Sequence, residues 1–402
     1  MLDNVSSDVH KYYFDQKVHD LDWDALVRQT RENIDRAPDM DTANAEIEAL
    51  LEKLNDSHTN FIAPRNTYRV DYGWSFRIIG NRGFITKVKA RSDAETKGVR
   101  PGDELLTIDG FTVDRVSAPK LKYAIYEFFP RKRLQLTLRD RAGKLLDLTV
   151  DSEIKEQTAI AGLGGSSWYR NQNIIDAENY WDKAKASYKD LGPELMILRI
   201  PAFYQMGFDV DNLMGQARAH KTLIVDLRGT PGGTTDSVLS YLGNLFDHDM
   251  KIGDWIKRNK VSPIMVKSRG QSAFTGNLIL LVDSETASGG EILARTVQIQ
   301  KRGTLLGDHT SGRTMASQFF VHKFGINPMY IYGDSVTISD TKMVDGKSLE
   351  NIGVEPDQII LPSAGDLAAG RDSVLAYAAG LAGVKMSPED AAKLFPSTAL
   401  TE

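Results

Sequence analysis

The sequence predicts a mixed α/β protein in which a helical segment, a β-rich module and an α/β core with a mostly parallel sheet follow one another. Three observations support this fold class. Apolar residues recur at helical spacing near the N-terminus, short strand patterns with turns follow from about residue 68, and apolar runs alternate with amphipathic stretches from about residue 193. Such alternation is typical of layered α/β folds. We therefore divide the chain into 1–66, 67–152, 153–365 and a C-terminal helical tail, 366–402.

Three helical patterns open the chain, and the third is the clearest. In "DTANAEIEALLEKLND" we expect Asp41 to cap the helix, since aspartate is a preferred N-cap residue. The apolar residues follow the spacing i, i+4, i+7, i+8, i+11, which places them on one helix face: Ala43, Ile47, Leu50, Leu51 and Leu54. A polar turn, "NDSHTNF", comes directly after this helix.

The second segment reads as short strands and turns. "YGWSFRIIG" and "RGFITKVKA" are typical of strands, and "KRLQLTLRD" and "KLLDLTVDS" indicate a hairpin around "RAGK". A glycine-rich stretch, 162–173, follows this module, and its role stays open.

The third segment predicts a parallel sheet. "ELMILRI", "TLIVDLRG" and "NLILLVDS" are nearly continuous apolar runs, as expected of strands buried on both faces. Helices are expected over 234–246 and 289–300, and further strands over 335–346 and 352–361 are expected to extend the sheet. In the tail, Ser387 followed by Pro388 predicts the start of a helix.

Composition excludes several classes of protein. A formal net charge of −5 and a pI near 5.9 argue against a nucleic-acid-binding protein. No apolar run reaches the roughly 18 residues of a membrane span, and the absence of cysteine excludes disulfides and thiolate chemistry. The first residues lack the basic and apolar regions of a signal peptide. We predict no metal ligands and no cofactor.

Two strand ends carry the residue types that catalysis needs. In "LIVDLRGTPGG", glycines before a helix allow backbone amides to approach an anion. In "ETASGGE", Ser288 lies between a strand and a helix, with the Gly289 amide beside it. Together they suggest a nucleophile between two oxyanion donors, one in the loop that contains Gly229, Gly232 and Gly233 and the other at Gly289. The alternative is that Ser288 only caps the helix in a capping box with Glu291.

A serine nucleophile needs a base, and the chain has seven histidines. His58 lies in the turn "DSHT", although a lone turn histidine is often a solvated surface residue. His309, in "GDHTSG", is also near a strand end and is the competing candidate. Glu350, in "SLENIGVEPD", is a turn carboxylate that could orient a histidine, with Glu355 as the alternative.

At this point the chain resembles the serine peptidases of the carboxyl-terminal processing protease and tricorn protease family, over about residues 12–362. "LLEKLNDSHTNF" is similar to the family's N-terminal helical segment, and "GWSF" with "GVRPGDELLTIDG" to a PDZ domain. "LIVDLRGTPGG" and "VDSETASGGEILA" resemble the core motifs, and "ENIGVEPD" the closing one. The resemblance implies a core layered like that of ClpP and crotonase.

The resemblance also distinguishes two catalytic branches. One uses a Ser-Lys dyad with the lysine 25 residues after the serine, but here that position is Arg313. Arginine stays protonated and cannot act as a general base. The tricorn-like branch uses a histidine in an "SH" pair and a glutamate in the closing motif. The resemblance therefore implies Ser288 as nucleophile, His58 as base, Glu350 as its orienting acid and Ser57 as a supporting hydrogen-bond partner.

The resemblance further implies a serine endopeptidase that hydrolyses unstructured or C-terminal peptide segments through an acyl-enzyme. The PDZ-like module would bind the substrate C-terminus through Gly73, Trp74, Ser75 and Phe76. An inactive binding module or a PDZ scaffold for peptides or hydrophobic ligands is the alternative. Polypeptides are the expected partners, and a homo-oligomer is compatible with the resemblance. The resemblance suggests an extracytoplasmic compartment, with the cytoplasm as the alternative.

Overall fold

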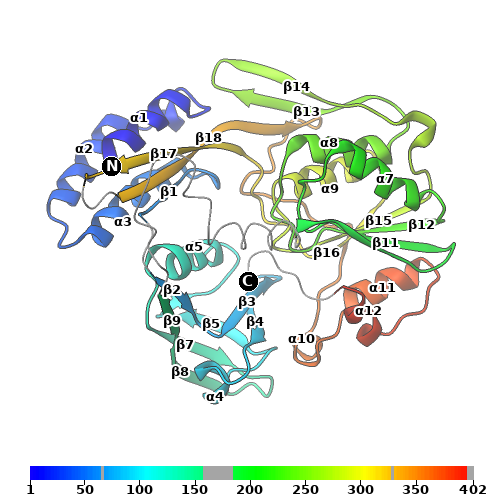
Figure 1. Cartoon of the computed structure of the whole chain (residues 1–402), viewed down its shortest axis with the longest axis horizontal. Helices are drawn as coiled ribbons and strands as arrows, with labels where there is room; N and C mark the ends of the chain where they lie inside the picture. The colour runs from blue at the N-terminus through cyan, green and yellow to red at the C-terminus, as the bar shows by residue number, and fades with distance from the viewer. Residues whose placement is uncertain (65–67, 157–183, 327–329, 396–402) are drawn as a thin grey trace.

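The computed structural model describes residues 1–64, 68–156, 184–326 and 330–395. The glycine-rich stretch 162–173 lies outside these ranges. The described part contains helices and four sheets, which confirms the predicted mixed α/β class. Figure 1 shows the N-terminal helices beside β17 and β18, the β-rich part below them, and the α/β core on the other side of the molecule.

The N-terminal helices bury their apolar faces against one another and against strands from elsewhere in the chain. Helix α3 begins after Asp39, whose carboxylate accepts a hydrogen bond from the Thr42 amide at 2.8 Å. The prediction that Asp41 caps this helix is therefore wrong. Asp41 lies inside the first turn, where its negative charge interacts favourably with the positive end of the helix dipole. The elements are α1 (Leu2–Tyr12), η1 (Val18–Asp20), α2 (Trp23–Asp35), α3 (Met40–Leu51) and η2 (Glu52–Leu54).

The β-rich part forms a sheet in the order β3-β4-β5-β7-β8, with β6 paired to β5 and a separate β2–β9 pair. The β7–β8 hairpin confirms the one predicted around "RAGK". A core of its own, which includes Phe76, Ile85 and Leu136, lies between this sheet and α5. The elements are β2 (Tyr68–Asp71), β3 (Trp74–Ile79), β4 (Arg82–Val88), α4 (Asp93–Thr96), β5 (Glu104–Ile108), β6 (Phe111–Thr112), α5 (Ala118–Tyr123), η3 (Ala124–Phe128), β7 (Arg133–Arg139), β8 (Leu145–Asp151) and β9 (Glu153–Glu156).

The α/β core contains a six-stranded sheet in the order β10-β11-β12-β15-β16-β19. From β11 to β19 neighbouring strands run parallel, and β10 is antiparallel to β11. The elements are β10 (Ser187–Asp190), β11 (Leu195–Arg199), α7 (Gly207–Ala217), β12 (Thr222–Asp226), α8 (Thr235–Leu245), η5 (Gly270–Ser272), β15 (Asn277–Val282), α9 (Gly289–Ile299), β16 (Thr304–Gly307), β19 (Gln358–Ile359), α10 (Ala364–Ala369), α11 (Ser373–Leu381) and α12 (Pro388–Leu394).

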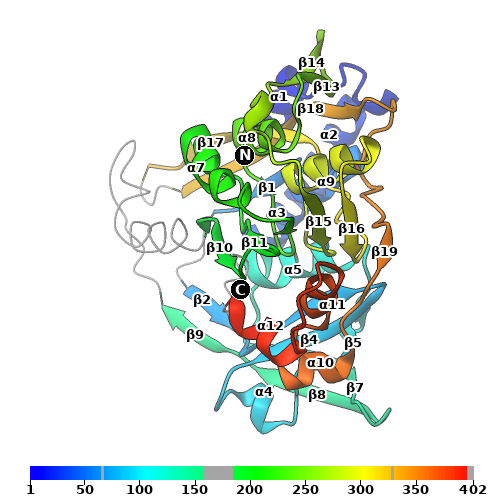
Figure 2. The same cartoon turned by 90° about the vertical axis from the view of Figure 1, so that its right-hand side faces the viewer.

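Both faces of this sheet are covered (Figures 1 and 2). Residues such as Leu198, Val225 and Leu280 pack under α7, α8 and α9, whereas their neighbours Ile197 and Ile224 pack against α11 and α12. Side chains alternate between the faces of a strand, so strands that are apolar throughout require helices on both sides. The C-terminal helices therefore complete the core.

The segment 335–346 does not extend this sheet as predicted. It belongs to β18, which forms an antiparallel sheet with β1, β13 and β17, while β14 pairs with β13. β18 is buried along most of its length. Its sequence therefore looks like that of a strand in a covered parallel sheet, although its neighbours are antiparallel. Residues 352–361 do contribute β19 to the parallel sheet. The elements of the second sheet are β1 (Asn60–Ile62), β13 (Met250–Lys257), β14 (Lys260–Val266), β17 (Ala316–Phe324) and β18 (Tyr330–Met343).

Among the described residues, the helices are too short or too polar to traverse a lipid bilayer.

Candidate active site

Ser288 lies in a sharp turn between the carboxyl end of β15 and the first residue of α9. Its backbone has φ 53° and ψ −118°, a conformation that non-glycine residues rarely adopt. A β-carbon on Gly289 would lie 2.6 Å from Val238 Cγ2, so only glycine fits after the serine without a shift of the neighbouring helix. A strained serine on a strand-to-helix turn is the geometry of a nucleophile elbow.

The alternative role of Ser288 is realised only in part, because the Glu291 side chain caps the Ser288 amide while, among the described residues, no amide donates to the Ser288 hydroxyl. The Glu291 carboxylate accepts from the Ser288 amide at 3.1 Å, and the Glu291 amide donates to the Ser288 carbonyl oxygen at 2.9 Å. An ordinary N-cap residue, however, has extended backbone angles with negative φ. Capping alone therefore does not explain the backbone of Ser288.

Glu291 does more than cap the helix, a role that our sequence analysis missed. It is fully buried, and its second carboxylate oxygen accepts from Thr310 Oγ1 at 2.6 Å and from the Gly312 amide at 2.7 Å. The Arg313 amide donates to the same oxygen as Ser288, at 2.9 Å. Burial raises the pKa of Glu291, and these donors oppose that rise. Glu291 thus joins the serine turn to the segment 310–313.

The glycine loop after β12 lies directly against the serine turn. A β-carbon on Gly232 would lie 2.5 Å from Ser288 Cβ and 3.3 Å from the Gly289 nitrogen. Gly233 has φ 147°, and a β-carbon there would collide with the Phe203 carbonyl oxygen at 2.3 Å. On either side of Gly233, the Gly232 carbonyl oxygen accepts from the Phe203 amide and the Thr234 amide donates to the Phe203 carbonyl oxygen. In the described part of the chain, no backbone hydrogen bond from the Gly233 or Gly289 amide occupies either donor.

His58 lies in the turn between η2 and β1, and it is half-buried. Its Nδ1 atom is 2.7 Å from the Ser57 hydroxyl oxygen. Asp56 holds the turn by accepting from the amides of His58 and Thr59 at 2.9 and 2.7 Å. Thr337 of β18 donates to Asp56 as well, at 2.7 Å. The position of His58 is therefore fixed by the sheet that β18 builds.

Glu350 is the carboxylate that the fold brings to His58. The Ser57 amide donates to one of its oxygens at 2.7 Å, and the Thr314 amide donates to the other at 2.8 Å. The Ser57 side chain is hydrogen-bonded to the same carboxylate. Burial raises the pKa of Glu350, and these hydrogen bonds oppose it. Glu355 is exposed, and its backbone carbonyl accepts from Gln298.

Arg313 connects the serine turn to the histidine turn. Its carbonyl oxygen accepts from the Ser288 amide at 2.7 Å, and its guanidinium donates to the Ser57 carbonyl oxygen at 3.1 Å. The next residue, Thr314, donates to Glu350. One short segment thus contacts Ser288, Ser57 and Glu350, which come from three distant parts of the chain.

The surroundings of His58 favour its neutral form. Desolvation lowers its pKa from 6.5 to about 4, and the positive charge of Arg313 lowers it further than the nearby Asp56 raises it. A histidine that is neutral over most of the physiological pH range can accept a proton, as a general base must.

The competing histidine, His309, lies elsewhere. Its Nδ1 atom is 3.1 Å from the Thr310 carbonyl oxygen, and its own carbonyl accepts from Arg115 at 2.8 Å. Arg115 also pairs with Asp308 at 2.9 Å. His309 therefore belongs to the contact between the β-rich part and the α/β core.

The predicted peptide-binding residues lie at the start of β3, an edge strand of its sheet. Gly73 has φ 72°, and a β-carbon there would lie 2.5 Å from Ser92 Cβ. Trp74 and Phe76 are 5% and 2% exposed, so both pack in the core of the β-rich part, while Ser75 points to the opposite, partly exposed face. The buried Trp74 Nε1 atom has no hydrogen-bond partner.

Part of the chain is similar to known peptidases. Residues 194–360 match the model of peptidase family S41. The chain is 24% identical over 323 residues to carboxyl-terminal-processing peptidase 3, chloroplastic, of Arabidopsis thaliana, covering 76% of this chain and 59% of the relative. It is 25% identical over 406 residues to putative tricorn protease homolog 2 of Streptomyces coelicolor, covering 93% and 31%. The chain thus spans less than two thirds of the length of the first relative and about a third of the second.

A solved structure shares the fold. Mature CPAF superposes with a TM-score of 0.67 at 13% sequence identity, covering 91% of this chain and 93% of that one. The family match begins at β11 and ends within one residue of β19, so it contains the parallel strands, the glycine loop, the serine turn and Glu350. The chain therefore carries a peptidase domain of family S41.

Proposed function

We propose that the protein is a serine peptidase in which Ser288 is the nucleophile, His58 the general base and Glu350 the acid that orients it through Ser57. One observation carries this proposal. A hydrogen-bonded chain runs from the Glu350 carboxylate through Ser57 to Nδ1 of His58, and Arg313 joins that chain to the Ser288 turn.

The chemistry follows from these contacts. Because Nδ1 of His58 is engaged by Ser57, Nε2 is the nitrogen that remains to accept a proton. His58 takes the hydroxyl proton as Ser288 Oγ attacks the peptide carbonyl, and Glu350 stabilises the resulting imidazolium. His58 then gives that proton to the leaving amine. Water, deprotonated by the same histidine, hydrolyses the acyl-enzyme and regenerates the free serine.

The two free amides are suited to the oxyanion. Gly289 follows Ser288 at the start of α9, and Gly233 follows Gly232, whose position lies against the Ser288 side chain. Neither the Gly233 nor the Gly289 amide has a backbone acceptor in the described structure. Donors of this kind stabilise the tetrahedral intermediate, and the loss of one typically costs ~10²–10³-fold in rate.

A serine-directed fluorophosphonate tests the proposal directly. We expect the wild-type chain to be labelled on a single serine, which mass spectrometry of the digested adduct identifies as Ser288. Unstructured peptides should be cleaved at a rate that falls in parallel with labelling. An unlabelled chain that cleaves no peptide would instead support the alternative of an inactive binding module.

We also propose that the β-rich part acts as a PDZ-like module that binds the free C-terminus of a polypeptide along β3. An edge strand can accept a peptide by strand addition, and Gly73 lies at the end where its carboxylate would bind. We expect a peptide with a free C-terminus to bind at least ~10-fold more tightly than its amidated form in fluorescence anisotropy. Equal affinities would contradict carboxylate recognition.

Replacing Glu350 by glutamine should lower kcat by roughly 10²–10⁴-fold, since a neutral amide cannot stabilise the His58 imidazolium. The amide retains one oxygen acceptor, so the fold should persist. Glu355→Gln is the matched control, because Glu355 is exposed and lies in the same turn region. Steady-state kinetics on both variants decides between the two glutamates, and a larger loss in Glu355→Gln would reverse the assignment.

Replacing Arg313 by alanine should retain the chemistry, because arginine is not the base. Removing its positive charge should raise the pKa of His58, so the acid limb of kcat/KM should move to higher pH. Arg313→Lys restores a positive charge and should return the limb toward its wild-type position. A folded Arg313→Ala protein without measurable turnover would show that Arg313 is required for catalysis.

Compartment and assembly stay predictions. We propose that the substrates are polypeptides. We also propose an extracytoplasmic compartment, which cell fractionation tests, and a homo-oligomer, which light scattering tests.

A further inference from the structure

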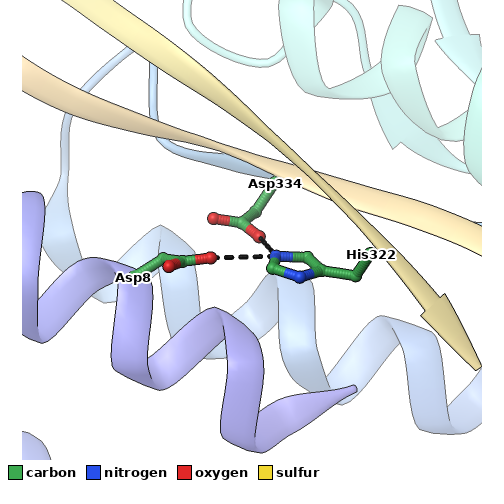
Figure 3. Close-up of side chains that lie close together, drawn as sticks. All are labelled: Asp8, His322 and Asp334. Atoms are coloured by element: carbon green, nitrogen blue, oxygen red, sulfur yellow. Dashed lines mark hydrogen bonds and ion pairs between the residues drawn. The ribbon is translucent and has the colours of Figure 1, made fainter. Parts of the chain in front are cut away.

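A second group of polar side chains lies between the N-terminal helices and the antiparallel sheet. Asp8 comes from α1, His322 from β17 and Asp334 from β18, and their side chains converge (Figure 3). His322 Nε2 is 2.9 Å from Asp8 Oδ2 and 3.0 Å from Asp334 Oδ1. One ligand atom from each residue lies within 4.8 Å of the other two.

Hydrogen bonding leaves this cluster incomplete. Nε2 of an imidazole carries at most one hydrogen, which His322 directs to Asp334 Oδ1. Asp8 Oδ2 and Asp334 Oδ2 are both buried and have no hydrogen-bond partner among the described residues, and Asp334 is 0% exposed. Unsatisfied carboxylate oxygens in such a position are costly unless a cation or a proton compensates them.

The neighbouring charges do not provide that compensation. In the described part of the chain, the ion pairs of Asp8 and Asp334 are both with His322, and neither carboxylate is paired with a lysine or an arginine. The Tyr332 ring lies against the imidazole, with centroids 5.2 Å apart, and holds it in place.

We propose that Asp8, His322 and Asp334 bind one Zn²⁺ ion, with a water molecule as the fourth ligand. One imidazole nitrogen and two carboxylate oxygens form a ligand set that zinc accepts. With metal–ligand bonds of about 2.0–2.2 Å, ligand atoms around one ion lie about 3–4 Å apart, close to the separations seen here. The ion would replace the proton between His322 and Asp334, and it would satisfy the free Asp8 Oδ2 atom.

Such an ion would fasten α1 to the β17–β18 hairpin. Because β18 also carries Thr337, which holds Asp56 below the His58 turn, the ion would stabilise the framework behind the proposed base. The inference does not depend on the peptidase proposal, since it concerns other residues and is tested without substrate. The sequence analysis predicted no metal ligands, because these three residues lie far apart in the chain and share no metal-binding motif.

Isothermal titration of the EDTA-treated full chain with ZnCl₂ tests the inference. We expect one equivalent to bind, and His322→Gln and Asp8→Asn to weaken binding at least ~10-fold. His248→Gln should bind as the wild type does, because His248 forms an exposed pair with Asp247 and serves as the matched control. Zinc should also raise the thermal midpoint of the wild type and of His248→Gln, but not of His322→Gln.

Three results would overturn the inference: no stoichiometric binding, equal binding by wild type and His322→Gln, or binding that is lost only in His248→Gln. A cluster that is an ion pair only would lower the midpoint of the variants by the same amount with and without zinc. If the variants do not fold, Co²⁺ titration of the wild type still decides. A saturable visible absorption band that Zn²⁺ displaces supports the site, and a featureless titration contradicts it.

Discussion

Ser288→Ala should lower kcat/KM for an unstructured peptide by at least ~10⁴-fold and abolish fluorophosphonate labelling. The reason is that alanine removes the proposed nucleophile from the turn that lies against the glycine loop at Gly232. The fold should be unaffected, since the backbone contacts of residue 288 with Arg313 and Glu291 remain available to alanine. Peptide hydrolysis and thermal unfolding, measured on the same preparation, separate the two effects.

Ser284→Ala is the matched control for this prediction. Ser284 belongs to the same turn and is also partly buried, but its hydroxyl donates to the Ile78 carbonyl oxygen of the β-rich part. It should keep its labelling and most of its activity. If Ser288→Ala retains peptide cleavage while Ser284→Ala loses it, the nucleophile has been misassigned.

His58→Gln should cause a loss of similar size, about 10⁴-fold in kcat, because the amide cannot accept the serine proton. Its thermal midpoint at pH 7.5 should stay within a few degrees of the wild type. In the wild type, kcat/KM should rise with pH through a limb near pH 4, where His58 loses its proton, rather than near the ordinary 6.5. A limb at 6.5 that His58→Gln leaves unchanged would contradict the role of His58.

The same pKa shift predicts how stability depends on pH. The folded protein holds His58 neutral down to about pH 4, whereas the unfolded chain binds a proton near 6.5. The contribution of neutral His58 to stability is therefore complete above pH 6.5 and is lost as the pH falls toward 4. Denaturant unfolding at pH 7 and pH 4.5 should show a larger loss for the wild type than for His58→Gln. Equal losses would argue that His58 is solvated.

The fold class was predictable for strands that are buried on both faces, because such strands are apolar throughout. The strand Leu195–Arg199 is apolar because helices cover both of its sides, so its composition predicts a buried strand. The segment 335–346 shows the limit of this reasoning. It is equally buried, but burial does not identify the neighbouring strand, and its partners come from hairpins at 250–266 and 316–343 that our sequence analysis did not recognise.

The candidate site was proposed through its resemblance to known motifs rather than through local pattern. Ser57, His58, Ser288 and Glu350 are each ordinary turn residues, and only the fold brings Ser57 and Glu350 into contact. The connecting residues were harder to predict. Arg313 acts through its backbone and its guanidinium at once, and Glu291 accepts from four donors contributed by two segments. The spacing of residues in the sequence does not predict such contacts, because they depend on the shape of the loops and not on a sequence motif.

The residues of the proposed catalytic site lie far apart in the sequence, and this affects when the site can form during synthesis. Ser57 and Glu350 are in direct contact, yet 293 positions separate them in the sequence. Contacts of such long range form late, because the intervening chain must first be ordered. A growing polypeptide therefore carries its histidine and its serine long before the glutamate leaves the ribosome. In the proposed mechanism, catalytic competence would arise only after Glu350 has been synthesised and has reached Ser57.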